Sequence, residues 1–97
     1  MKFTKEKIEA YKAKYPEGIW LFEVEDGKSC ILHEPSRQDY SYICACNDPV
    51  AANELIVSQL WVDGDDIIKT NFKYTVGVAS QATETVLRKM EVKVKNL

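Results

Sequence analysis

The sequence predicts a single α+β domain over residues 1–97, with an N-terminal helix, a β-hairpin that forms a small antiparallel sheet, and two or three helices packed on one face. Three observations predict this architecture. Apolar residues recur at helical spacing near both ends of the chain. An Asp-Gly pair separates two strand-like runs between residues 19 and 34, and an Asp-Pro pair at 48–49 opens a strongly apolar helix. The length suits one modest hydrophobic core.

The first predicted helix begins after Thr4, a good N-cap residue, and runs to about Tyr15. Ile8, Tyr11 and Tyr15 recur at positions i, i+3 and i+7, which gives the helix one apolar stripe. Pro16 then ends it.

Residues 19–25 and 28–34 are predicted to form a hairpin around Asp26-Gly27. A two-residue type I′ turn would pair Glu25 with Lys28 and Phe22 with Ile31. The outer edges of such a hairpin are able to accept a strand from a partner. The predicted core face carries Trp20, Phe22, Val24 and Ile31, and the opposite face carries Glu23, Glu25, Lys28 and Cys30.

Residues 37–46 are predicted to form a short helix, since Ser36 followed by Asp39 resembles a capping arrangement. A third strand is the alternative, because Tyr40, Tyr42, Cys44 and Cys46 occupy every second position.

The helix over residues 49–62 is the most informative segment, with Asp48 as its N-cap and Pro49 at its first position. Its apolar residues point in almost every direction around the helix axis. Such a helix is normally buried on most sides, so part of its surface is expected to contact another chain. The acidic turn at 63–66 is expected to end it.

Ile67 and Ile68 are expected to make a buried loop contact, after which Thr70 or Asn71 caps a last helix extending towards Leu97. Strand-like alternation at residues 72–78 and 90–94 leaves a β alternative open. The broad apolar face of the helical version carries Phe72, Val76, Ala79, Ala82, Val86, Leu87, Met90, Val94 and Leu97.

Composition and charge exclude several classes of function. Hydrophobic residues make up 45% of the chain and charged residues 29%, as in ordinary globular domains, and a net charge of −2 argues against a nucleic-acid partner. Since the sequence has neither a signal-peptide core nor a run of about 18 apolar residues, we expect a cytoplasmic protein without a membrane partner. Three cysteines do not form a disulfide framework.

The residue types that carry catalysis or bind metals are sparse. His33 is the sole histidine, and Cys44-Ala45-Cys46 lacks the spacing of a zinc site. The acidic turn at 63–66 lacks the spacing of an EF-hand loop. We therefore expect no enzyme activity, catalytic residue, cofactor or metal. A small metal or thiol protein using Cys30, His33, Cys44 and Cys46 is the alternative from another class.

Several short motifs occur in a fixed order along the chain. The Lys-rich first helix ends in K-x-K-Y at residues 12–15, and Pro-Ser-Arg opens a helix at 35–37. The Asp-Pro helix ends in W-V-D-G-D at 61–65, and the chain closes with a Lys-rich tail ending in Leu97. Taken in order, these elements resemble small phage and prophage proteins described as tail assembly chaperone-like. The Cys-rich segment 42–46 and the strand-like segment 73–78 depart from this pattern.

The resemblance implies a non-enzymatic role in a bacterial host cell, in which the protein holds the tape-measure protein during tail assembly. A holdase of this kind needs apolar surface beyond its own core. A different small phage or bacterial interaction protein, such as an inhibitor using the hairpin edge, is the alternative, and a homo-oligomer fits either. The candidate interface residues are Leu55, Ile56, Leu60, Trp61, Val86 and Met90.

Overall fold

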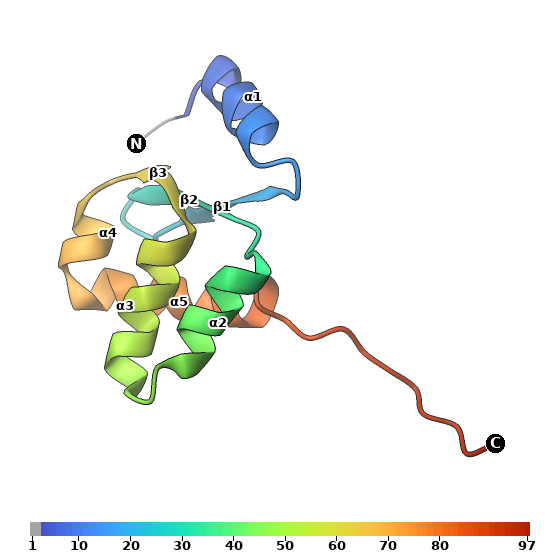
Figure 1. Cartoon of the computed structure of the whole chain (residues 1–97). Helices are drawn as coiled ribbons and strands as arrows, with labels where there is room; N and C mark the ends of the chain where they lie inside the picture. Colours follow the sequence, from blue (N-terminus) through green and yellow to red (C-terminus); the bar gives the residue numbers. More distant parts are fainter. Residues whose placement is uncertain (1–2) are drawn as a thin grey trace.

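The computed structural model describes residues 3–97, and its elements follow one another as a helix, a hairpin, two helices, a third strand and two more helices (Figure 1). The α+β class, the N-terminal helix and the hairpin predicted from the sequence are confirmed. The elements are α1 (Lys5–Lys14), β1 (Ile19–Glu23), β2 (Ser29–His33), α2 (Arg37–Ala45), α3 (Pro49–Leu60), β3 (Trp61–Gly64), α4 (Ile67–Thr70) and α5 (Phe72–Thr85).

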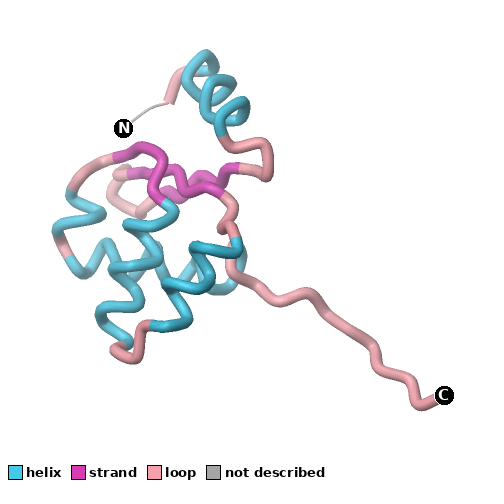
Figure 2. Tube along the Cα trace, in the orientation of Figure 1, coloured by secondary structure: helices cyan, strands magenta, loops and turns pink. Residues whose placement is uncertain are grey.

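Within residues 3–97 the sheet has three antiparallel strands in the order β1-β2-β3, so β2 lies in the centre. Helices α2 to α5 lie on one side of the sheet and α1 lies on the other (Figures 1 and 2). The residues after α5 leave the domain as an extended tail (Figure 2).

The helices begin where local side-chain chemistry predicts. The side chain of Thr4 accepts a hydrogen bond from Lys7 N, and that of Asp48 accepts one from Val50 N. Ser36 and Asp39 form a complete capping box, in which each side chain accepts from the backbone N–H of the other residue. This capping box lies at the start of α2. Residues 37–45 therefore form the predicted helix and not the alternative strand.

The predicted hairpin register is wrong by one residue. Phe22 pairs with Cys30 rather than Ile31, and the loop has three residues instead of two. Gly27 N donates to the carbonyl of Val24 and Gly27 has a φ of +92°, as in a type I turn followed by a residue of positive φ. A shift of one residue moves each side chain of β2 to the other face, so Cys30 and Leu32, and not Ile31, join the core.

The third strand was not predicted, because Trp61 and Val62 were expected to be the end of a helix. Instead α3 ends at Leu60, and Trp61 pairs with Leu32 on the central strand. Aromatic and β-branched residues suit a strand, and pairing here satisfies the second edge of β2. A bulge separates the Leu32–Trp61 pair from the Ile31–Asp63 pair.

The last helix is much shorter than predicted. Helix α5 ends at Thr85 and residues 88–97 are extended. Its residues 72–78 are helical, which excludes the alternative strand there. Val86 is the last buried residue of the chain, and a helix beyond it would have no partner to bury its apolar face. Phe72 is 40% exposed, and Thr75 and Val78 face the core in its place.

The core lies between the sheet and the helices that cover it. Ile68, expected in a buried loop, is fully buried in α4, and its carbonyl accepts a 2.5 Å hydrogen bond from Thr75 Oγ1. The buried apolar cluster comprises Cys30, Leu32, Ile56, Val57, Leu60, Ile68, Val78, Ala79, Ala82 and Val86.

Helix α1 contacts the opposite face of the sheet through aromatic side chains. Tyr11 donates a 2.5 Å hydrogen bond to Asp63, which is paired with Ile31 in the sheet. The ring of Tyr15 stacks on that of His33 with 4.6 Å between centroids. Ile31 is 2% exposed although it is not part of the core cluster.

Candidate functional site: a groove between strand β1 and helix α5

An open groove of about 810 Å³ runs between strand β1 and helix α5. Tyr74, near the start of α5, hydrogen-bonds to Asp26, just beyond the end of β1, so α5 runs back along β1 towards Trp20. The floor and walls are a mixture of apolar, acidic and neutral polar residues, together with one lysine. They are Trp20, Leu21, Phe22, Glu23, Val24, Glu25 and Asp26 of the hairpin, and Lys73, Tyr74, Gly77, Val78, Gln81 and Thr85 of α5.

Strand β1 forms one side of this groove and is an edge strand among residues 3–97. The carbonyl of Gly18 accepts from Glu34 N at 2.9 Å, and Val24 N donates to the carbonyl of Lys28 at 2.7 Å. Because inward-facing positions alternate in an antiparallel pair, the backbone groups of Leu21 and Glu23 face outward. Leu21 is 54% exposed, so this edge is open to an incoming strand.

The two faces of β1 differ in character. Trp20 and Phe22 pair with Leu32 and Cys30, and therefore lie on the same face as the core and α5. Trp20 remains 42% exposed, and its indole Nε1–H donates to the Glu34 carboxylate at 2.8 Å. A strand added to this edge would thus place alternate side chains beside an apolar surface.

The hairpin end of the groove is acidic and is tied to α5. Tyr74 donates a hydrogen bond to the carboxylate of Asp26. This bond lowers the pKa of Asp26 and raises the pKa of Tyr74, because it favours the ionised carboxylate and the protonated phenol. Glu23, Glu25 and Asp26 line the groove together with Lys73, so three carboxylates outnumber one ammonium and the groove favours basic groups in its occupant.

Gly77 has no side chain and therefore leaves open space on the side of the groove that α5 forms. It lies in the middle of α5, is exposed, and a Cβ there would meet no atom within 4 Å. A glycine inside a helix costs about 1 kcal/mol relative to alanine, so this position gives up stability and leaves open space. In the sequence, Gly77 is visible as a glycine within a helical pattern. Its role in the groove becomes apparent only once β1 is known to lie opposite α5.

The six predicted interface residues are not brought together at one surface. Ile56, Leu60 and Val86 lie in the core of the chain itself, at 6%, 0% and 3% exposure. Their apolar surface is therefore used within the fold. Met90 is 87% exposed in the tail, far along the chain from the other members.

Leu55 and Trp61 are partly exposed near Lys69. Leu55 lines a small hollow of about 380 Å³ to which Lys69 also contributes. The Lys69 ammonium lies 4.5 Å from the centroid of the Trp61 ring, within the range of a cation–π contact. This hollow is smaller than the groove and is lined by residues of helices α3, α4 and α5.

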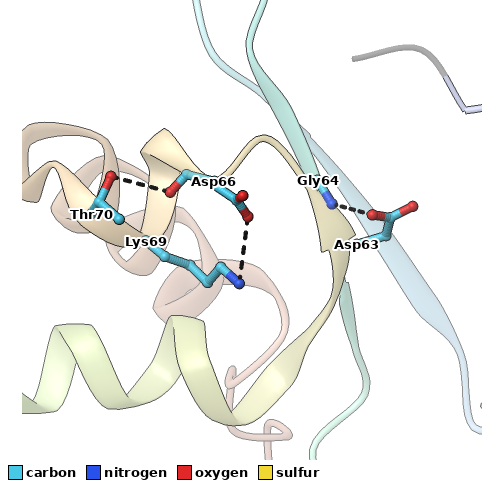
Figure 3. Close-up of polar contacts among 5 residues, drawn as sticks. All are labelled: Asp63, Gly64, Asp66, Lys69 and Thr70. Atoms are coloured by element: carbon cyan, nitrogen blue, oxygen red, sulfur yellow. Dashed lines mark hydrogen bonds and ion pairs between the residues drawn. The ribbon is translucent and has the colours of Figure 1, made fainter.

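The acidic segment 63–66 directs its carboxylates to different donors. Asp63 accepts from Gly64 N at 2.8 Å, and Asp66 lies 3.7 Å from the Lys69 ammonium (Figure 3). Asp65 accepts from Ser29 N at 2.9 Å. In the part of the chain that the structure describes, no group of three or more potential metal ligands occurs.

The cysteines and the histidine are likewise spread out. Cys30 is buried in the sheet, Cys44 is exposed on α2, and the Cys46 thiol donates to the carbonyl of Asp48. The two ring nitrogens of His33 lie 2.9 and 3.1 Å from the carbonyl oxygens of Glu34 and Gln59. These contacts hold His33 at the rim of the sheet.

Across residues 3–97, every helix is too short or too polar to cross a bilayer. Comparison of the chain with models of known protein families, with curated proteins and with solved structures gave no match.

Proposed function

We propose that this chain is a non-enzymatic protein-binding module that holds an extended segment of another protein in the groove between β1 and α5. The observation that carries the proposal is the open edge of β1 beside an apolar groove of about 810 Å³. Backbone hydrogen bonds to the edge would supply affinity, and the groove would accept alternate side chains.

The chemistry of the groove specifies the segment it would bind. Phe22, Val24 and Val78 favour aliphatic residues at every second position. Glu23 and Glu25 favour lysine or arginine at the intervening positions near the hairpin end. The expected ligand is therefore an extended strand of alternating aliphatic and basic residues.

A blocked decapeptide of alternating valine and lysine tests this proposal. In two-dimensional NMR of the labelled protein, we expect it to shift the amide signals of Leu21, Glu23 and Gly77 more than those of α1. Gly77→Leu fills the groove and should remove the shifts. Ser80→Leu places the same side chain on an exposed position of α5 outside the groove, and should leave them. Shifts elsewhere, or none, would overturn the proposal.

The resemblance to tail assembly chaperone-like proteins supports a more specific version, in which the segment belongs to a phage tape-measure protein. An extended, aggregation-prone client would present strands of the kind the groove accepts. Co-expression with tape-measure fragments tests it. Fragments that become soluble with the wild-type chain and not with Gly77→Leu support this version. Equal solubility with both variants would reject it.

A further inference from the structure

The C-terminal tail, residues 88–97, has the composition of the strand that the groove is expected to bind. Met90, Val92 and Val94 alternate with Glu91 and Lys93, and Lys95 follows. The three apolar side chains are 87%, 78% and 90% exposed. The tail extends away from its own domain (Figure 1). Alternation of this kind is typical of a strand with one buried face.

We propose that two copies of this chain exchange tails, each tail adding as a fourth strand to β1 of the other copy; this inference rests on the groove of the proposed function. Ten extended residues reach about 33 Å, which exceeds the length of five-residue β1. Reciprocal exchange gives two equivalent interfaces and a closed dimer.

The charges on the two strands match this pairing. The tail carries four basic side chains and one acidic side chain, so the rest of the chain is more acidic than the net charge of −2 suggests. The basic residues within the strand-like part of the tail are Lys93 and Lys95. The acidic residues of β1 and of the turn that follows it are Glu23 and Glu25.

The charges fit an added strand that runs parallel to β1. In this arrangement Lys93 and Lys95 lie beside Glu23 and Glu25, and Glu91 lies towards the start of β1. When Lys93 and Lys95 lie on the same face of the sheet as Glu23 and Glu25, Met90, Val92 and Val94 lie on the other face. That face carries Trp20, Phe22 and Val24.

The end of α5 favours pairing of the tail with β1 of a second copy over return of the tail to β1 of the same chain. A tight return from a helix end, as from α5 to its neighbour β1, commonly uses glycine. No glycine or proline follows Gly77 in the sequence. Leu87 N donates to the carbonyl of Ala82 at 2.8 Å, and the chain then continues outward.

Light scattering of the full chain from micromolar to millimolar concentration tests the exchange. We expect the mass to rise from one chain to two. Gly77→Leu in the groove and Val92→Asp in the tail should each weaken dimerisation by about tenfold or more, the loss of one well-packed contact. Ser80→Leu and Asn96→Asp are the matched controls and should leave it unchanged. Both tested positions are exposed, so folding is preserved.

A charge swap gives a second, independent test. Lys93→Glu with Lys95→Glu should keep the chain monomeric, and combining these changes with Glu23→Lys and Glu25→Lys should restore the dimer. Dimerisation of unchanged affinity in Gly77→Leu would place the interface elsewhere and overturn the exchange. A wild-type monomer at all concentrations would also overturn it. If the valine–lysine peptide still bound that monomer at the groove, the proposed function would stand.

Discussion

A Cβ atom on Gly64 would lie 2.6 Å from the Cα of Cys30, its partner across the β2–β3 pair. Gly64 also has a φ of +154°. Both features require glycine, because residues with a side chain rarely adopt this φ and because backbone atoms fill the space that a Cβ would occupy. Strand β3 can approach the central strand because of this one residue.

Gly64→Ala is therefore expected to destabilise the fold by about 2–4 kcal/mol, from backbone strain together with the clash. Gly77→Ala is the matched control, since its Cβ meets nothing within 4 Å and the site is helical. It should stabilise the fold by about 0.5–1 kcal/mol. Urea denaturation of the two variants measures both changes. Equal stabilities for the two would contradict this assignment.

Leu60→Ala is expected to cost about 3–5 kcal/mol, because Leu60 is fully buried and its removal leaves a cavity. Val50→Ala on the same helix should cost less than about 1 kcal/mol, since Val50 is 51% exposed. Thermal unfolding followed by circular dichroism compares them. A small effect of Leu60→Ala would show that this side chain does not belong to the core.

The three cysteines are expected to differ in reactivity. Burial, together with the charge of Asp65, raises the pKa of the Cys30 thiol to about 12, so this group forms little thiolate at neutral pH. Cys44 is exposed and should react with iodoacetamide in the native protein. Mass spectrometry should find Cys30 modified only after unfolding. Modification of Cys30 at the rate of Cys44 would contradict its burial.

The Tyr74–Asp26 hydrogen bond predicts a loss of stability at both ends of the pH range. The pKa of Asp26 is lowered in the folded state, so its contribution is present above the unfolded value of about 3.9 and is lost as the pH falls through the folded value. The pKa of Tyr74 is raised, so its contribution is present below about 10 and is lost as the pH rises through the folded value.

Tyr74→Phe should flatten the dependence of unfolding free energy on pH at both ends, as measured by urea titration from acid to alkaline pH. Tyr40→Phe, on exposed α2, is the control and should retain the wild-type profile. The hydrogen bond of Tyr11 to Asp63 raises the pKa of Tyr11 as well, so part of the alkaline loss should persist in Tyr74→Phe. A wild-type profile in Tyr74→Phe would argue against the bond.

Local chemistry was sufficient to predict where most helices begin. Thr4, Ser36, Asp48 and Asn71 each accept a backbone hydrogen bond at the start of a helix. The hairpin was located correctly, but its register was not. An Asp-Gly pair serves two-residue and three-residue loops alike, and the choice between them changes which face of β2 is buried.

Long-range pairing limited the rest of the prediction. Trp61 and Val62 continue an apolar helix in sequence, and only the open edge of β2 makes them a strand. The groove could not be predicted for the same reason, since Gly77 and Phe22 come to line one groove only through the packing of α5 on the sheet. The sequence did suggest a strand edge able to accept a partner, and β1 is such an edge in residues 3–97.

Helix α1 buries none of its residues Lys5–Lys14, and it rests on the sheet through Tyr11 and the adjoining Tyr15. An element with so little buried surface opens at a small fraction of the free energy of global unfolding. Its amide hydrogens should therefore exchange with deuterium long before those of β2 and α5. Because Tyr11 and Tyr15 contact Asp63 and His33, the neighbours of Ile31 on that side of the sheet, each such opening is expected to expose Ile31 while the core remains folded.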